Sequence, residues 1–136
     1  MNDVYIIATD FDGTIVEDKY PEIGAIDTET LEALLEAKRF GTKLILWTCR
    51  NGKKLTDAVD FCKAHGLEFD AVNENVEEIK AVYGGDTRKV FANEYWDDHS
   101  RGIHGEPVMS DKHYSEFAQD MVKDMVKAAE AVMNIV

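Results

Sequence analysis

The sequence predicts an α/β fold with a central parallel sheet, because short buried strands alternate along the chain with amphipathic helices. The first observation is a pair of near-continuous apolar runs at 4–8 and 43–47, which are typical of strands buried on both faces. The second is the helical spacing of leucines within 28–40, between the two runs. A strand, a helix and a second strand in this order indicate parallel strands joined by a right-handed crossover.

Two helices have clear end signals. The helix over 28–40 is preceded by Asp27, a residue type that caps helix N-termini, and is followed by Gly41, which favours helix termination. The second helix is expected to open at Asn51 or Gly52 and to close at Gly66. The first helix therefore leads into the predicted strand at 43–47, and the second helix follows that strand.

The rest of the chain adds weaker elements. The stretch 15–26 is expected to be irregular, because Pro21 and Gly24 interrupt it. Apolar residues recur at helical spacing beyond Ser110 and predict a C-terminal amphipathic helix at about 110–135. We expect one domain over 1–136, which also contains a strand at 69–72, a helix at 76–83 and a polar strand near 90–96.

Composition excludes several classes of partner. The chain has 136 residues and a formal net charge of −12, which disfavours a nucleic-acid backbone or an anionic membrane as the main partner. The first residues lack the basic start of a secretory signal, and the apolar runs are too short to span a bilayer. We therefore expect a cytoplasmic protein with neither a nucleic-acid nor a membrane partner.

Polar residues follow every predicted strand. In open α/β sheets, ligands bind outside the carboxyl ends of the strands. These ends carry Asp10 and Asp12, then Thr48 and Arg50, then Asn73 and Asn75, and finally Asp97 and Asp98.

The carboxylates predict a metal site. Asp10 and Asp12 are two residues apart, so on an extended chain they point the same way. Together with Asp97 and Asp98 they would make four carboxylates, which cannot all stay ionised without a cation between them. An all-oxygen site suits Mg²⁺. Asp-x-Asp alone is more often a solvated turn, but here a buried strand runs directly into it.

These stretches resemble the motifs of the haloacid dehalogenase-like (HAD) hydrolases. Residues 7–14 resemble the first signature of that superfamily, and 44–48 look like the second motif. Lys89 resembles the basic third motif, and 94–98 resemble the acidic fourth. The resemblance covers residues 4 to about 102, and the chain looks most like the short HAD-like proteins of bacteria and their phages.

The resemblance implies a Rossmann-like three-layer sandwich and a phosphatase that forms an aspartyl-phosphate on Asp10. Asp12 would act as acid and base, Thr48 would bind a phosphoryl oxygen, and Lys89 would neutralise charge. Arg88 precedes Lys89 and is the alternative basic residue.

The same resemblance implies where Mg²⁺ is held. Asp10, the backbone carbonyl of Asp12, and either Asp97 or Asp98 would provide the ligands. Two further residues are candidates for substrate contact: Arg50 at a helix start, where backbone N–H groups favour anions, and Asn73. The competing interpretation of Arg50 is a solvated helix start.

A cap domain is not expected. The segments 15–47 and 49–88 are too short for one beyond the helices that the core needs, and 17–26 would form only a short flap. The site should be open to a small phosphorylated substrate unless a second subunit covers it. The C-terminal helix is interpreted either as a cover for the core, which is favoured, or as the surface of a homodimer.

Two alternative functions stay open. One is a phosphotransferase or a nucleotidase. The other is a regulatory protein that binds phosphate or Mg²⁺ without turnover, although binding alone would not need both Asp10 and Asp12.

Overall fold

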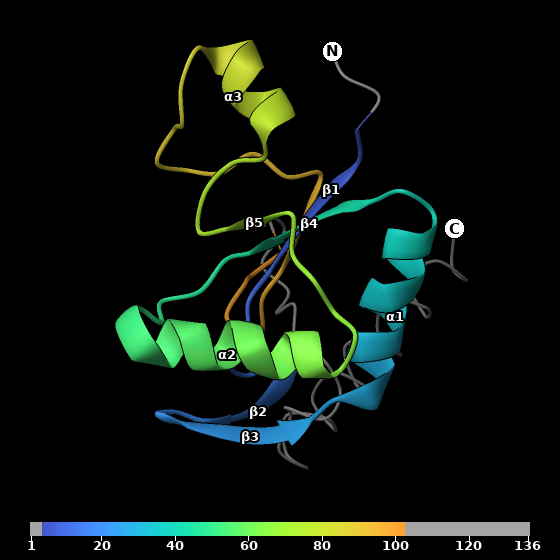
Figure 1. Cartoon of the computed structure of the whole chain (residues 1–136), viewed down its shortest axis with the longest axis vertical. Helices are drawn as coiled ribbons and strands as arrows, with labels where there is room; N and C mark the ends of the chain where they lie inside the picture. Colours follow the sequence, from blue (N-terminus) through green and yellow to red (C-terminus); the bar gives the residue numbers. More distant parts are fainter. Residues whose placement is uncertain (1–3, 103–136) are drawn as a thin grey trace, which may run out of the picture. The chain divides into compact units, whose positions relative to one another are not determined.

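The computed structural model describes residues 4–102, and its helices and strands all lie within one compact unit, Met1–Asp98. Its centre is a four-stranded parallel sheet in the order β5-β4-β1-β6 (Figure 1). The strands are β1 (Ile6–Thr9), β4 (Lys43–Leu46), β5 (Ala71–Val72) and β6 (Glu94–Trp96). The predicted α/β class and the parallel sheet are therefore confirmed.

The described helices also match the sequence pattern. They are α1 (Thr28–Arg39), α2 (Gly52–Ala64) and α3 (Glu77–Tyr83). Asp27 caps α1, because its side chain accepts hydrogen bonds from the backbone N–H groups of Glu29 and Thr30 at 3.0 and 3.3 Å. α3 ends at Gly84 in the left-handed conformation.

Both faces of the sheet are buried, which explains why β1 and β4 are apolar throughout. Ile7 belongs to a core that includes Leu34 of α1 and Ala58 of α2. Ile6 and Ala8 belong to a second core, which includes Ile79 of α3. Because successive side chains of a strand point to opposite faces, α1 and α2 pack on one face of the sheet and α3 on the other.

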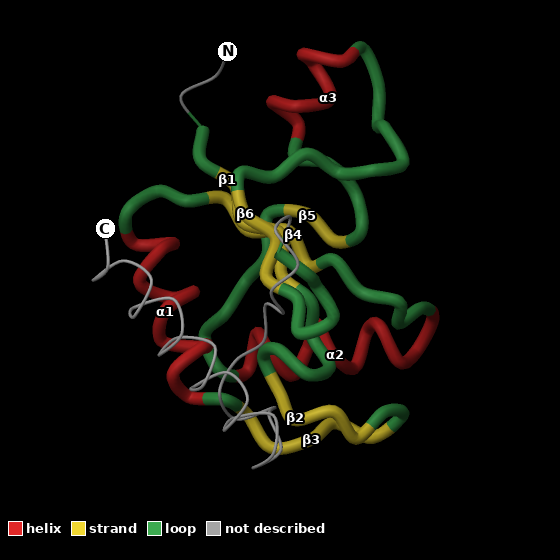
Figure 2. The backbone as a smooth tube through the Cα atoms, turned by 180° about the vertical axis from the view of Figure 1, so that it is seen from behind, coloured by secondary structure: helices red, strands yellow, loops and turns green. Residues whose placement is uncertain are grey.

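The stretch expected to be irregular is instead an antiparallel hairpin, so this prediction was wrong. β2 (Val16–Lys19) pairs with β3 (Glu22–Ile26), and the turn consists of Tyr20 and Pro21. Figure 2 shows the two strands side by side, away from the central sheet. In β2 only Val16 is buried, so the strand has no apolar run that would reveal it in the sequence.

Some predictions fall outside this description. The C-terminal helix at about 110–135 lies outside the described residues, and the single domain and homodimer stay predictions. No helix within residues 4–102 is both long and apolar enough to cross a membrane.

Candidate functional site

The site is built on the edge where β4, β1 and β6 end, called here the carboxyl edge. Thr9, the last residue of β1, is paired with Leu46 of β4 and with Trp96 of β6. The three neighbouring strands thus end at the same level, and the loops that follow them meet. The backbone N–H of Asp10 donates to the Trp96 carbonyl at 2.8 Å, which fixes the start of the first loop against the last strand.

Three carboxylates meet at this edge. Asp10, Asp97 and Asp98, the acidic cluster, each offer one carboxylate oxygen, and these oxygens all lie within 4.8 Å of one another. All three residues are partly buried. Carboxylate oxygens are the donors that Mg²⁺ prefers, so the cluster fits this ion chemically. Acidic groups also gather on protein surfaces without a metal, so the cluster alone does not identify one.

The environment of Asp10 disfavours its charged form. Burial, which is the largest cause, and the nearby charges of Asp97, Asp98 and Asp12 together raise the pKa of its carboxyl group from 3.8 to about 7. One contact opposes them: the backbone N–H of Phe11 donates to Asp10 Oδ1 at 2.8 Å, which lowers the pKa. A bound cation would counter this repulsion.

The loop after β1 is a tight turn anchored by a buried side chain. Phe11 is fully buried, and its carbonyl accepts hydrogen bonds from the N–H groups of Thr14, Ile15 and Val16. Gly13 has a φ of +86°, and a Cβ placed there would lie 2.6 Å from Cγ of Asp98 and closer still to its Oδ2. Glycine is needed here both for its conformation and because Asp98 packs against its Cα.

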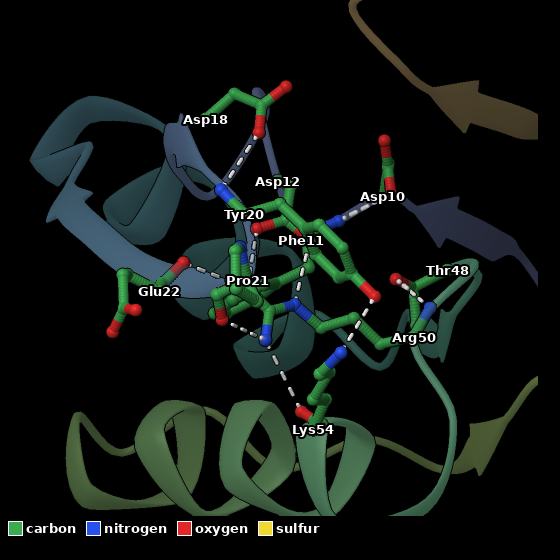
Figure 3. A network of polar contacts seen from close by, with 10 residues as sticks. All are labelled: Asp10, Phe11, Asp12, Asp18, Tyr20, Pro21, Glu22, Thr48, Arg50 and Lys54. Atoms are coloured by element: carbon green, nitrogen blue, oxygen red, sulfur yellow. Dashed lines mark hydrogen bonds and ion pairs between the residues drawn. The ribbon is translucent and has the colours of Figure 1, made fainter.

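Asp12 points to a different partner. Its two carboxylate oxygens accept hydrogen bonds from Nε and Nη2 of Arg50, both at 2.7 Å (Figure 3). Its carboxylate is not part of the acidic cluster, although it is close enough to raise the pKa of Asp10. Asp12 therefore lies at the site, but its carboxylate is held by Arg50, which lies just before α2.

The position of Arg50 does not support the predicted contact with substrate. Arg50 is 2% exposed, so it is neither open to a ligand nor part of a solvated helix start. Its pKa is raised mainly by the hydrogen bonds to Asp12, so it remains fully charged. Its place beside the site could be predicted from the sequence, whereas its burial and its partner could not.

Thr48 and Asn73 are brought together at the ends of β4 and β5. The N–H of Thr48 donates to Asn73 Oδ1 at 2.8 Å, and the N–H of Arg50 donates to Thr48 Oγ1 at 3.2 Å. Asn73 has a positive φ of 54°, and its own N–H donates to the Leu46 carbonyl. Its side chain therefore shapes the loop that carries Thr48.

Lys89 precedes β6 and lies beside Tyr95 of that strand. It is exposed, and its Nζ lies 5.8 Å from the centre of the Tyr95 ring. The charges that shift the pKa of Asp10 are all carboxylates. Arg88 is exposed as well, so the choice between the two basic residues stays open.

Asn75, which also follows the third strand, has a structural role. It is 1% exposed, and its side-chain amide donates to Asp86 Oδ1 at 2.9 Å and to Thr87 Oγ1 at 3.0 Å. Its Oδ1 accepts a hydrogen bond from the N–H of Phe91 at 2.7 Å. The amide thus holds the segment between α3 and β6 in place.

Comparison with known proteins gives one informative match. No profile of a protein family and no curated protein matches the chain. A solved structure described as that of a conserved protein from Bacteroides thetaiotaomicron is 35% identical, with a TM-score of 0.64, over 93% of this chain and 92% of that one. The chain belongs to the family of this Bacteroides protein. At this identity and coverage the two proteins share a fold.

The chemistry that this site can perform depends on the groups that it brings together. The arrangement offers a cluster of three carboxylates, a fourth carboxylate paired with Arg50, and the Thr48 hydroxyl in the loop after β4. Such a set of groups can bind a divalent cation and present a carboxylate oxygen as a nucleophile.

Proposed function

We propose that this protein is a Mg²⁺-dependent phosphohydrolase of the HAD type, which acts on a small phosphorylated substrate through an aspartyl-phosphate on Asp10. The observation that carries the proposal is the acidic cluster at the carboxyl edge, in which the oxygens of Asp10, Asp97 and Asp98 lie within 4.8 Å. The order of the motifs along the chain supports the same assignment.

The reaction would proceed in two displacements. First, a carboxylate oxygen of Asp10 bonds to phosphorus while the bond from phosphorus to the leaving oxygen breaks, and Asp12 gives a proton to that oxygen. Then water attacks the phosphorus of the aspartyl-phosphate, Asp12 takes the proton of the water, and Asp10 is released as a carboxylate with inorganic phosphate. Splitting the displacement in this way replaces one difficult step by two easier ones.

The other groups would manage charge. Mg²⁺, when bound, supplies positive charge that offsets the phosphate and the acidic cluster. Asp10, the carbonyl of Asp12, and Asp97 or Asp98 would hold it. The Thr48 hydroxyl would donate to a phosphoryl oxygen. Lys89, or Arg88 in its place, would provide a further cation by reaching the edge from the segment before β6.

The proposal includes the finer features of the fold. We place the sheet in a three-layer sandwich with α1 and α2 on one side and α3 on the other, and we propose that no cap domain covers the site. The hairpin would then be the flap beside the entrance. A cytoplasmic location is part of the same proposal.

Hydrolysis of an aryl phosphate, with Mg²⁺ and with a chelator, tests the function. Asp10→Asn keeps the size of the side chain and should lower turnover by about a thousandfold or more, which corresponds to about 4 kcal/mol in the barrier. Asp60→Asn is the matched control, because it makes the same change at an exposed position of α2. A folded Asp10→Asn protein with near-normal turnover would contradict the mechanism. Mg²⁺ binding without any turnover would favour the regulatory alternative.

A further inference from the structure

Arg50 lies between the hairpin and the carboxylate that we assign as acid and base. We propose that Arg50 is a positioning residue that links the hairpin β2–β3 to Asp12, so that the position of the hairpin sets the orientation of the Asp12 carboxylate. The catalytic consequence of this link rests on the proposed function, whereas the link itself does not.

The hydrogen bonds of Arg50 use its whole guanidinium group. Nε and Nη2 donate to the two oxygens of Asp12, and Nη2 also donates to the carbonyl of Glu22 at 3.0 Å. Nη1 donates to the carbonyls of Pro21 at 3.3 Å and Lys54 at 3.5 Å. A guanidinium has five N–H donors, and these contacts account for all five. Arg50 therefore has no donor left for a phosphate.

The surroundings of the guanidinium keep it in place. Its side chain is 1% exposed, and its Cζ lies 5.1 Å from the ring centres of both Phe11 and Tyr20. Lys54 closes the outer side, with its Nζ 5.2 Å from the Tyr20 ring centre. An ion pair shielded from water in this way is costly to break from one side, because the remaining charge stays buried.

The hairpin is thus attached at two points to the loop that carries Asp12. At its base, the N–H of Gly13 donates to the carbonyl of Val16 at 2.8 Å. At its turn, the carbonyls of Pro21 and Glu22 accept from the same guanidinium that holds Asp12 (Figure 3). These turn contacts involve main-chain atoms, so displacement of the turn displaces or frees the guanidinium.

The pairing leaves Asp12 chemically competent. Each carboxylate oxygen has two lone pairs, and each accepts one hydrogen bond from Arg50. The Asp12 side chain is 15% exposed, so a remaining lone pair can take up a proton and the protonated group can give it to a reacting oxygen. Arg50 would fix the direction of these lone pairs, which determines whether a proton reaches the leaving oxygen.

Hydrogen exchange tests the link without any need for turnover. In Asp12→Asn, one of the two oxygens that accept from Arg50 becomes an NH₂ group, which cannot accept a hydrogen bond. Exchange of the hairpin amides within 16–26 should then be about tenfold faster or more. Asp10→Asn is the matched control, because it makes the same change two residues earlier, where the side chain contacts Phe11 N–H rather than Arg50. We expect wild-type exchange in the hairpin of this control. Equal hairpin exchange in wild type and Asp12→Asn would overturn the link.

The choice of leaving group tests the catalytic consequence. A poorly placed proton donor matters most for alkyl phosphates, whose leaving oxygen needs a proton, and least for aryl phosphates with good leaving groups. Arg50→Gln and Arg50→Lys should each lower kcat for an alkyl phosphate about tenfold more than for an aryl phosphate. Arg39→Gln, at an exposed position of α1, should leave this ratio unchanged.

A double variant separates positioning from loss of structure. If Arg50 acts through Asp12, adding Arg50→Gln to Asp12→Asn should change the ratio no further. An equal loss for both substrates in the single Arg50 variants would overturn the positioning role while leaving the proposed function standing. If the wild type hydrolyses neither substrate, the proposed function fails, and the exchange experiment still decides the link.

Discussion

Replacing Gly13 by alanine separates the two reasons for which this position requires glycine. The first is conformational, because a φ of +86° is unfavourable for a residue with a Cβ. The second is the close approach of Asp98, whose Cγ would lie 2.6 Å from the new Cβ. A carboxylate at that distance must move, and moving it away from Gly13 disturbs the acidic cluster.

The expected cost can be divided in the same way. The backbone conformation should destabilise the alanine variant by about 1–2 kcal/mol. Displacing a packed side chain should add about 1–3 kcal/mol, although relief of repulsion among Asp10, Asp97 and Asp98 offsets part of it. For a chain of this length, 1 kcal/mol corresponds to a change in Tm on the order of 4 °C.

Thermal unfolding with Mg²⁺ and with a chelator, at constant ionic strength, is the assay. Gly41→Ala is the control, because Gly41 has a similar φ of +92° and a Cβ there would meet no atom within 4 Å. Both variants should lose stability through the backbone. Mg²⁺ at about one hundred times its Kd should stabilise the wild type and Gly41→Ala by about 2.7 kcal/mol, and Gly13→Ala by less than half as much.

The comparison can fail in two informative ways. If Gly13→Ala matches Gly41→Ala both in Tm and in its response to Mg²⁺, the approach of Asp98 to Gly13 has no role in stability or in metal binding. A wild type that is indifferent to Mg²⁺, both alone and with beryllium fluoride, would refute the metal site itself.

Three further predictions use the same unfolding measurements. Asp97→Asn should remove most of the stabilisation by Mg²⁺ and raise the Tm of the metal-free protein, whereas Asp60→Asn should do neither. A full Mg²⁺ response in Asp97→Asn would contradict the assignment of Asp97 to the metal site. The pKa of Asp10 is raised from 3.8 to about 7, so the metal-free folded state holds the proton of Asp10 more tightly than the unfolded state does. The stability that this protonation contributes is present below pH 3.8 and is lost as the pH rises to about 7. Asp10→Asn should remove this part of the pH dependence, and identical stability–pH curves would show that the pKa is not raised. Asp27→Ala should destabilise the protein by about 1 kcal/mol because Asp27 caps α1. Asn51→Ala should destabilise it by only about a few tenths of a kcal/mol, because the Asn51 side chain makes no capping hydrogen bond at α2. Equal losses of stability in the two variants would contradict the role of Asp27 as a cap.

The sequence by itself determined the elements whose signals are local. An apolar run revealed β1 and β4, because a strand buried on both faces contacts apolar groups on both sides. Leucine spacing and Asp27 revealed α1, because its periodicity and its cap lie within a few residues of one another. The order of strands and helices was then enough to place the ends of β1 and β6 at one edge, and with them Asp10, Asp97 and Asp98.

The tertiary structure alone decided which side chains meet. The hairpin was missed because the exposed residues of β2 have no periodicity to detect, and its strands are held together by backbone hydrogen bonds that any residue type except proline can make. Arg50 contacts Asp12 across 38 residues of sequence, and Gly13 meets Asp98 across a longer separation. Such contacts depend on how strands and loops pack together, and no local pattern encodes that packing. The sequence therefore predicted which residues lie at the site, whereas only the fold determined the partner of Asp12 and the neighbour of Gly13.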